Sequence, residues 1–141
     1  MTTAITFGAY DLFHIGHLNL LRNARSQCDR LVVGVATDER ISRYKNKRPI
    51  FPDNERLEIV RSCRYVDEVF LNDDDPGNFE SYEKWVKKFG AGKIFIGSDW
   101  QGTEKYEKIG ALLKEFNCEL IYLPHTDGVS TSDIIKRILG T

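Results

Sequence analysis

The feature that most limits how this chain can fold is an alternation of short apolar runs with helical patterns. Five apolar segments predict β-strands, at residues 4–8, 31–36, 65–71, 93–97 and 119–123. Helical spacing predicts helices around residues 18–24 and over 79–89, 104–116 and 131–139. A further helix is predicted to begin at an Asp53 cap and to continue to Cys63. In the helix over 131–139, Ile134, Ile135 and Ile138 are expected to form the inner face.

Strands that are continuously apolar and alternate with helices are typical of a parallel sheet covered on both faces. Right-handed crossovers then lead to an α/β fold, a Rossmann-like, doubly wound sandwich with a five-stranded parallel sheet. Ligands of such folds bind beyond the carboxyl ends of the strands. The segments that follow the strands are therefore the candidate functional segments.

Length and composition fit one intracellular domain. The 141 residues suit a single domain over 1–141. Twenty Lys and Arg against 21 Asp and Glu leave a formal charge of -1, which argues against a nucleic-acid-coating surface. Three cysteines without a C-x-x-C pair predict reduced thiols. Because neither a secretory signal nor a bilayer-spanning apolar run is recognisable, we expect a cytoplasmic protein without membrane or nucleic-acid partners.

The segment after the first expected strand carries the strongest functional signal. It contains Gly8, Ala9, Tyr10, Asp11, His14, Gly16 and His17. The unpaired N–H groups and positive dipole at a helix start favour an anion. Gly16 leaves room for a phosphate, and the imidazoles of His14 and His17 can donate hydrogen bonds to its oxygens. Packing and metal binding are the alternatives, although no third ligand lies nearby in sequence to close a metal site.

A basic segment follows the second expected strand. Residues 44–49 include Lys45 and Lys47. They form either a solvated charge run or a mobile lid whose ammonium groups close over a polyphosphate.

The start of the last expected helix offers a second anion site. Gly128 provides a turn, and Ser130 and Asp133 have capping-box spacing, so a purely structural cap would suffice for Ser130 alone. Three consecutive hydroxyls, on Ser130, Thr131 and Ser132, also suit an anion. Two phosphate-ready helix starts at one sheet edge suggest a nucleoside triphosphate that spans both.

The loop after the fourth expected strand, residues 97–102, has two interpretations. Trp100 packs in the core, as most tryptophans do, or it forms the wall of a base pocket. In the second case Asp99 would accept a hydrogen bond from an exocyclic amine of the base. The residues alone leave both open.

Taken together, these segments resemble the cytidylyltransferases, a family of HxGH nucleotidyltransferases. The resemblance covers nearly the whole chain and rests on four motifs, at residues 8–17, 64–69, 99–100 and 128–132. It implies a homodimeric enzyme that transfers CMP from CTP to a small phosphorylated alcohol and releases pyrophosphate. Glycerol-3-phosphate is the leading acceptor. The resemblance also implies Mg²⁺ held mainly by the nucleotide phosphates, without dedicated protein ligands.

Carried over by motif, the resemblance assigns roles to individual residues. The triphosphate would be bound by Ala9, Tyr10, His14, Gly16, His17, Thr126, Gly128, Val129, Ser130, Thr131 and Ser132. The cytidine would lie among Arg64, Asp99 and Trp100, and the nucleotide-binding set is completed by Gly8, Asp11, Gly97 and His125. Lys45 and Lys47 would close over the α-phosphate and the acceptor.

The expected chemistry needs no general base. The phosphate of the acceptor is largely dianionic near neutral pH, since its second pKa is about 6. Catalysis is then positioning together with stabilisation of the charge on the transferred phosphate. We assign this role to His14, His17 and Lys45.

Two positions depart from the family pattern. His125 stands where an arginine is usual, and an imidazole lacks the bidentate fork of a guanidinium. Tyr82 stands where the glycerol-phosphate enzymes carry an acceptor-binding lysine, and Lys84 lies close by. The candidate acceptor-binding residues are Lys45, Tyr82, Lys84 and His125. An adenylyltransferase acting on a sugar phosphate or flavin mononucleotide is the alternative activity, and a non-catalytic nucleotide sensor is the alternative from another class.

Overall fold

A parallel five-stranded sheet in the order β3-β2-β1-β4-β5 forms the centre of the computed structural model, which describes residues 1–75 and 78–140. Thr141, the last residue of the expected domain, lies outside the described residues. The strands are β1 (Thr3–Gly8), β2 (Arg30–Ala36), β3 (Glu68–Asn72), β4 (Ala91–Gly97) and β5 (Glu119–Leu123). All four strand pairings are parallel, as the apolar runs predicted.

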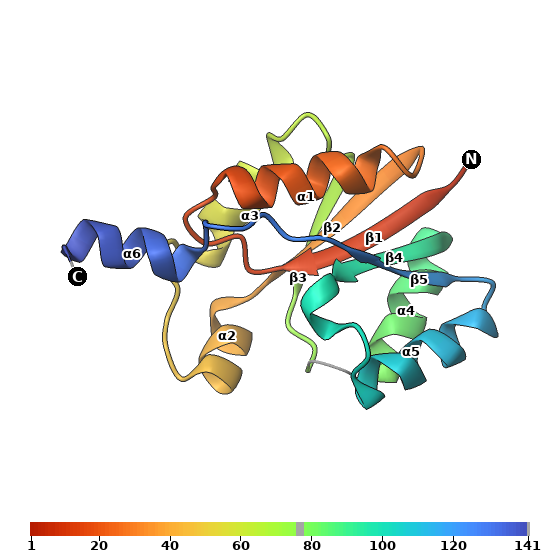
Figure 1. Cartoon of the computed structure of the whole chain (residues 1–141). Helices are drawn as coiled ribbons and strands as arrows, with labels where there is room; N and C mark the ends of the chain where they lie inside the picture. The colour runs from red at the N-terminus through yellow and green to blue at the C-terminus, as the bar shows by residue number, and fades with distance from the viewer. Residues whose placement is uncertain (76–77, 141) are drawn as a thin grey trace.

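Helices cover both faces of the sheet, so the fold is a doubly wound, Rossmann-like α/β sandwich (Figure 1). On one face, α1 (Ile15–Arg25) and α3 (Asp53–Arg61) contribute Leu21 and Val60 to the core. On the other face, α4 (Phe79–Phe89) and α5 (Glu104–Lys114) contribute core residues such as Leu113. This two-sided cover explains why residues 31–36 of β2 are all buried.

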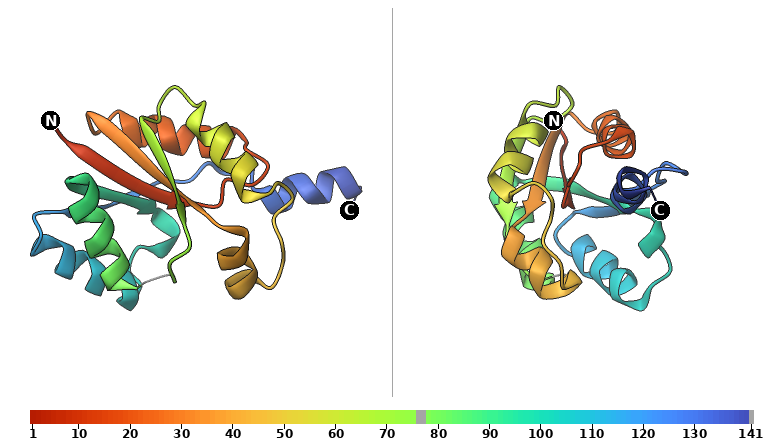
Figure 2. Two further views of the ribbon diagram at one scale, coloured as in Figure 1. Left: turned by 180° about the vertical axis from the view of Figure 1, so that it is seen from behind. Right: turned by 90° about the vertical axis from the view of Figure 1, so that its left-hand side faces the viewer.

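Two helices lie beyond the carboxyl edge of the sheet, α2 (Asp38–Lys45) and α6 (Thr131–Leu139). Figure 2 shows α6 extending away from the sheet. The expectation that Ile138 lies on an inner face of this helix is wrong, because its side chain is 74% exposed. Only the first turns of α6 pack on the rest of the chain, where Ile134 and Ile135 are partly buried.

The helix α2 was not predicted, and it changes the extent of the expected basic loop. Only Ile41 of this helix is buried, so its sequence shows no apolar periodicity. Tyr44 and Lys45 belong to its last turn, and the loop begins at Asn46, whose left-handed backbone (φ 51°) ends the helix.

Three element ends also differ from expectation. Strand β3 begins at Glu68 because residues 63–66 form a turn, in which the N–H of Val66 donates to the carbonyl of Cys63. Helix α5 ends at Lys114, shortly before Asn117 adopts a left-handed conformation. Asp53 is the first residue of α3 rather than its cap, since Pro52 occupies the cap position without a side-chain hydrogen bond.

The strand order places a topological switch point between β1 and β4. From β1 the chain moves outward to β2 and β3, and it then returns to β4 on the other side of β1. Crossovers that leave in opposite directions open a crevice at the carboxyl ends of these two strands. No helix in the described residues 1–75 and 78–140 has the length and apolar character needed to cross a bilayer.

Candidate active site

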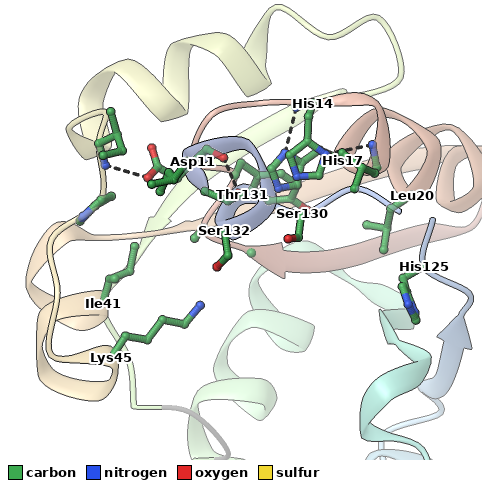
Figure 3. Close-up of a pocket in the computed structure, with 18 of the residues that line it drawn as sticks. Asp11, His14, His17, Leu20, Ile41, Lys45, His125, Ser130, Thr131 and Ser132 are labelled. Carbon is green, nitrogen blue, oxygen red and sulfur yellow. Dashed lines mark hydrogen bonds between the residues drawn. The ribbon is translucent and has the colours of Figure 1, made fainter. Parts of the chain in front are cut away.

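A cavity of about 530 Å³ opens at the carboxyl end of β1. Its walls come from segments far apart in the sequence: the end of β1 with the start of α1, α2 with the following loop, Asp99 after β4, and the stretch from His125 to the start of α6. Figure 3 shows His14 and His17 beside Ser130 and Thr131 on one wall, with Lys45 reaching in from α2. His125 lies on another side of the cavity.

The two histidines of the first wall hold each other through the start of α1. Nδ1 of His14 accepts a hydrogen bond from the backbone N–H of Gly16 (3.0 Å), as a helix cap does. Nδ1 of His17 accepts one from the backbone N–H of His14 (3.2 Å), and the two rings stack with centroids 3.8 Å apart. Because both Nδ1 atoms act as acceptors, the proton of each neutral ring lies on Nε2. Each ring therefore keeps one N–H donor for a ligand.

Burial keeps these imidazoles neutral. Desolvation lowers the pKa of His17 to about 4, and a charge on His14 would lower it further. Desolvation also lowers the pKa of His14. The rings of Tyr10 and Phe13 lie against His17, with centroids 5.3 and 5.4 Å away, and account for part of this burial. At neutral pH the histidines are hydrogen-bond donors rather than cations.

The ring of Tyr10 packs against His17, and its hydroxyl is buried and does not reach into the cavity. Its side chain is only 3% exposed, and its backbone has φ of 57°, in the left-handed region. Such a conformation costs free energy for a bulky residue and is retained where the surrounding structure requires it. Here the left-handed conformation of Tyr10 directs its ring toward His17.

The start of α6 is fastened to the loop after β1. Ser130 caps α6, since its Oγ accepts from the N–H of Asp133 (3.0 Å). Oγ1 of Thr131 donates to the carbonyl of Asp11 (2.8 Å). Nδ2 of Asn19 on α1 donates to Oγ1 of Thr126 (3.0 Å). The starts of α1 and α6 therefore line one cavity.

Gly16 is required for this close approach. A Cβ at this position would lie 2.9 Å from Cε1 of His14 and 3.2 Å from Cγ1 of Val129. The space beside Gly16 is thus filled by His14 and by the start of α6. Its lack of a side chain allows the two helix starts to meet, in addition to any room it leaves for a phosphate.

Asp11 anchors the far end of the basic loop. Its carboxylate is almost buried and accepts from the backbone N–H groups of Leu12 (3.1 Å), Ile50 (2.7 Å) and Phe51 (2.9 Å). The loop that carries Lys47 is therefore attached to the cavity at its second end and to α2 at its first.

Arg56 is a buried connector that the sequence did not reveal. Its side chain is 0% exposed and donates to the carbonyls of Phe51 (2.9 Å), Ala9 (2.7 Å) and Ala36 (2.8 Å). It also pairs with Asp38 at 2.7 Å. These bonds join the ends of β1 and β2 to both ends of the segment that carries the lysines. The available signal was the spacing of Arg56 from Val60, which places both on the inward side of α3.

A second cavity of about 400 Å³ adjoins the first. The two share lining residues at the end of β1 and on α2, namely Phe7, Gly8, Ala9, Ile41 and Lys45. The second cavity is bordered by aromatic rings from three further segments: Tyr82, Trp85, Trp100 and Tyr106. Trp100 is 52% exposed, so it is a wall of this cavity and not a core residue.

Most of the predicted site residues meet at these two cavities. The first is lined by Gly8, Ala9, Tyr10, Asp11, His14, Gly16, His17, Lys45, Lys47, Asp99, His125, Thr126, Val129, Ser130, Thr131 and Ser132. The second is lined by Gly97, Trp100 and Tyr82. Gly128 makes the turn before α6, with φ of 81°. His125 lies between two carboxylates, with Nδ1 3.2 Å from Asp99 and Nε2 3.4 Å from Asp127.

Two predicted residues lie elsewhere. Arg64 precedes β3 and so belongs to the amino edge of the sheet, where it contacts the hydroxyl of Tyr65 (3.1 Å). Arg64 lines neither of the two cavities, so its assignment to the cytidine site stays a prediction that the position of Arg64 does not support. Lys84 lines neither cavity, because its Nζ pairs with Asp74 at 3.0 Å and lies over the ring of Trp85.

Several cavity residues were not predicted as site residues. In the first cavity these are Phe7, Leu20, Ile41, Arg48, Pro49, Ile50 and Ile135. In the second, the unpredicted charged residues are Arg40, Lys105, Asp74 and Asp75. Arg40 was not predicted as a site residue because helix α2, which carries it, was not predicted. The sequence signal for the start of this helix is the Thr37 cap followed by two acidic residues.

Comparison with known proteins agrees with this geometry. The cytidylyltransferase-like family model matches residues 5–137. Glycerol-3-phosphate cytidylyltransferase of Staphylococcus aureus (strain NCTC 8325 / PS 47) is 36% identical over 140 residues, which cover 99% of this chain and 97% of the relative. FAD synthase of Thermococcus kodakarensis is 37% identical over 139 residues, covering 95% and 89%. A crystal structure of the lipopolysaccharide core biosynthesis protein from Thermoplasma volcanium GSS1 has a TM-score of 0.72 and 26% identity, and the match covers 90% of this chain and 99% of that one.

Proposed function

Because the chain belongs to the cytidylyltransferase-like family, we propose that it transfers CMP from CTP to a small phosphorylated alcohol and releases pyrophosphate. The observation that carries the proposal is the meeting of two helix starts, α1 and α6, in one cavity with two neutral imidazole donors. Helix starts favour anions through free N–H groups and the helix dipole. A triphosphate bound to the starts of α1 and α6 would be oriented by N–H groups, so this side of the cavity needs no buried cation.

The reaction is an in-line exchange of two P–O bonds. An oxygen of the acceptor phosphate forms a bond to the α-phosphorus of CTP, and the bond from this phosphorus to the α–β bridging oxygen breaks. The electron pair of the broken bond leaves with pyrophosphate. Since the acceptor attacks as an oxyanion, no proton has to be removed. Nε2–H groups of His14 and His17 would donate to the transferred phosphate, where negative charge develops.

Lys45 is suited to bring the two anions together. Its side chain lines both cavities, and among the described residues it has no carboxylate within ion-pair distance. A flexible ammonium at the junction would reduce the repulsion between the α-phosphate and the acceptor phosphate. Lys47, on the following loop, would close over the first cavity.

We propose that the divalent cation enters with the substrate, as MgCTP. In the described part of the chain, no group of three or more His, Cys, Asp or Glu is placed to hold a metal. The carboxylate of Asp11 already accepts three backbone N–H groups. Mg²⁺ binds readily through substrate phosphates and keeps several waters. The phosphates of CTP would therefore be its main ligands.

Charge pairing in the second cavity favours an acceptor with a neutral tail. Asp74 pairs with Lys84 (3.0 Å) and accepts from Nε1 of Trp85 (3.0 Å), while Asp75 lies 3.7 Å from Arg43. A cationic tail would have to compete with these partners and would meet the positive charge of Lys45. Glycerol-3-phosphate, which the name of the Staphylococcus relative also contains, fits better than phosphoethanolamine or phosphocholine.

A second candidate is transfer of AMP from ATP to flavin mononucleotide. The similarity to FAD synthases at 33–37% identity favours it, and the aromatic second cavity would suit a flavin. The two candidates differ in both the nucleotide and the acceptor. A test therefore has to vary these two substrates together.

Pyrophosphate release tests these proposals directly. CTP and ATP are each combined with glycerol-3-phosphate, phosphoethanolamine, phosphocholine and flavin mononucleotide in the presence of Mg²⁺. The highest kcat/KM is expected for CTP with glycerol-3-phosphate. Preference for ATP with flavin mononucleotide would establish the second candidate instead. Nucleotide binding without pyrophosphate from any pair would identify a sensor and contradict both.

Two further proposals concern the state of the protein. We propose the homodimer that the family resemblance implies, for which sedimentation equilibrium should give twice the mass of one chain.

A cytoplasmic location accords with three cysteines that are all free thiols. Fractionation of the source cells would test the location.

A further inference from the structure

Three cations line the second cavity without a carboxylate partner. They are Arg40, Lys45 and Lys105, and none of them forms an ion pair within the residues that the structure describes. The two acidic residues of the same cavity are paired with Lys84 and Arg43, which lie outside it. The cavity therefore presents uncompensated positive charge, which favours an anionic ligand.

Arg40 is the cation of this cavity whose orientation is fixed. Its backbone N–H donates to Oγ1 of Thr37 (3.1 Å) in the cap of α2. Its side chain is half-buried, and Nε donates to the carbonyl of Asp74 (2.6 Å). Both terminal nitrogens of the guanidinium lack a hydrogen-bond partner among residues 1–75 and 78–140. Lys45 and Lys105, in contrast, are exposed, and no hydrogen bond to the described residues holds either ammonium group, although Nζ of Lys105 lies over the ring of Tyr106.

Tyr82 lines the same cavity as Arg40. Burial raises the pKa of Tyr82, whereas the positive charge of Arg40 acts to lower it, as a cation close to the phenol would. The phenol of Tyr82 is therefore neutral, so Arg40 is a positive charge of this cavity that Tyr82 does not compensate. Both side chains line the second cavity, on opposite elements α2 and α4.

We propose that Arg40 binds the phosphate of the acceptor and thereby takes part in acceptor recognition; this inference rests on the proposed transfer reaction. The two free terminal nitrogens match two oxygens of a phosphate monoester, which leaves the third oxygen to attack CTP. The side chain on α4 that lines this part of the cavity is the phenol of Tyr82, so the fixed cation comes from Arg40 on α2. Lys45, at the junction of the cavities, remains available for the α-phosphate.

A purely structural role for Arg40 is the competing explanation, because its Nε holds the carbonyl of Asp74. Arg43 provides a matched control. It lies on the same helix, its Nη2 donates to the neighbouring carbonyl of Asp73 (2.8 Å), and it lines neither cavity. If fastening this loop to α2 were all that mattered, Arg40→Gln and Arg43→Gln would have similar effects.

Steady-state kinetics of Arg40→Gln, Arg40→Lys and Arg43→Gln separate the explanations. In Arg40→Gln, KM for glycerol-3-phosphate should rise about 10- to 100-fold, since hydrogen bonds to a charged group are lost, while KM for CTP stays within about twofold. Arg40→Lys should recover part of the loss, and Arg43→Gln should leave both constants near wild type. An unchanged acceptor KM in Arg40→Gln overturns the proposal. So does an equal rise in both KM values, or an equal effect of Arg43→Gln.

Direct binding keeps this inference distinct from the proposed reaction. Glycerol-3-phosphate is titrated calorimetrically into wild type and Arg40→Gln, each mixed with CTP in the absence of divalent cations. Weaker binding to the variant, with unchanged melting temperature, supports the role of Arg40 even if the wild type releases no pyrophosphate. Equal affinity of both proteins, or no binding to wild type, contradicts it. Absence of pyrophosphate with every substrate pair counts against the proposed function alone.

Discussion

Nδ1 of His17 accepts a hydrogen bond from the backbone N–H of His14, and the two imidazoles stack with their centroids 3.8 Å apart. Since Nδ1 of His14 in turn accepts from Gly16, the pair is a reciprocal cap as well as a ligand-binding group. The same hydrogen bonds that begin α1 select the tautomer with Nε2–H. Helix formation thus determines which atoms face a phosphate.

Replacing His17 tests its catalytic role. His17→Ala removes one oriented donor to the transferred phosphate, so kcat should fall by roughly 10²–10³-fold. The dissociation constant for CTP should change much less, because the N–H groups at the starts of α1 and α6 remain. Rapid-quench turnover and calorimetric CTP binding give the two values. Because His17 also caps α1, circular dichroism must show that the helix content is retained; an unchanged kcat would reject the assignment.

Lys45 should matter for turnover more than any lysine outside the cavities. Lys45→Ala removes the charge at the junction of the cavities, and we expect a fall in kcat of roughly 10²-fold. Lys108→Ala is the control, since Lys108 is exposed on α5 and, among the residues that the structure describes, pairs with Glu104 alone. Pyrophosphate release at saturating substrates gives both rates. Similar rates for the two variants would mean that Lys45 does not contact the reacting phosphates.

The neutral state of His17 should make the protein less stable in acid. Its pKa is lowered from 6.5 to about 4 by folding, so the unfolded chain takes up the proton first as the pH falls. The corresponding stability is complete above pH 6.5 and is lost between pH 6.5 and about 4. Urea unfolding of wild type and His17→Asn at several pH values measures it as the difference between the two proteins. A difference that does not shrink over this range would contradict the lowered pKa.

Arg56 should be the arginine of α3 on which stability depends. Arg56→Met leaves three carbonyls and Asp38 without their partner, so the free energy of unfolding should fall by about 3–5 kcal/mol. Arg61→Met on the same helix is the control, because its side chain is 54% exposed, and its effect should stay within about 0.5 kcal/mol. Denaturant titrations of both variants give these values. Equal, small effects would show that the buried connector is dispensable.

Elements that are stabilised by burial were predictable from the sequence, whereas elements held by hydrogen bonds to distant residues were not. The strands were predictable because residues 31–36 are covered on both faces, which leaves a continuous apolar run in the sequence. The helix α2 was not, because it buries only Ile41 and is held at its ends by hydrogen bonds to distant residues, such as that between Asp38 and Asp53. Arg40 and Arg56 were overlooked for the same reason. Arg40 bonds to Asp74, 34 residues away, and Arg56 bonds to Ala36 and Ala9, 20 and 47 residues away at the ends of two strands.

By itself, the sequence determined the order of the five strands along the chain, the helices other than α2, the parallel sheet and the family, because apolar periodicity and local motifs such as His14-Ile15-Gly16-His17 depend on neighbouring residues. The sequence also led to the expectation that the starts of α1 and α6 share one sheet edge. Only the tertiary structure decided that Arg64 lies at the opposite edge of the sheet and that Arg40 lines the second cavity. These relations depend on the order in which strands pair and on hydrogen bonds between segments far apart in the chain. No local pattern records them, since the residues involved become neighbours only when the sheet has formed.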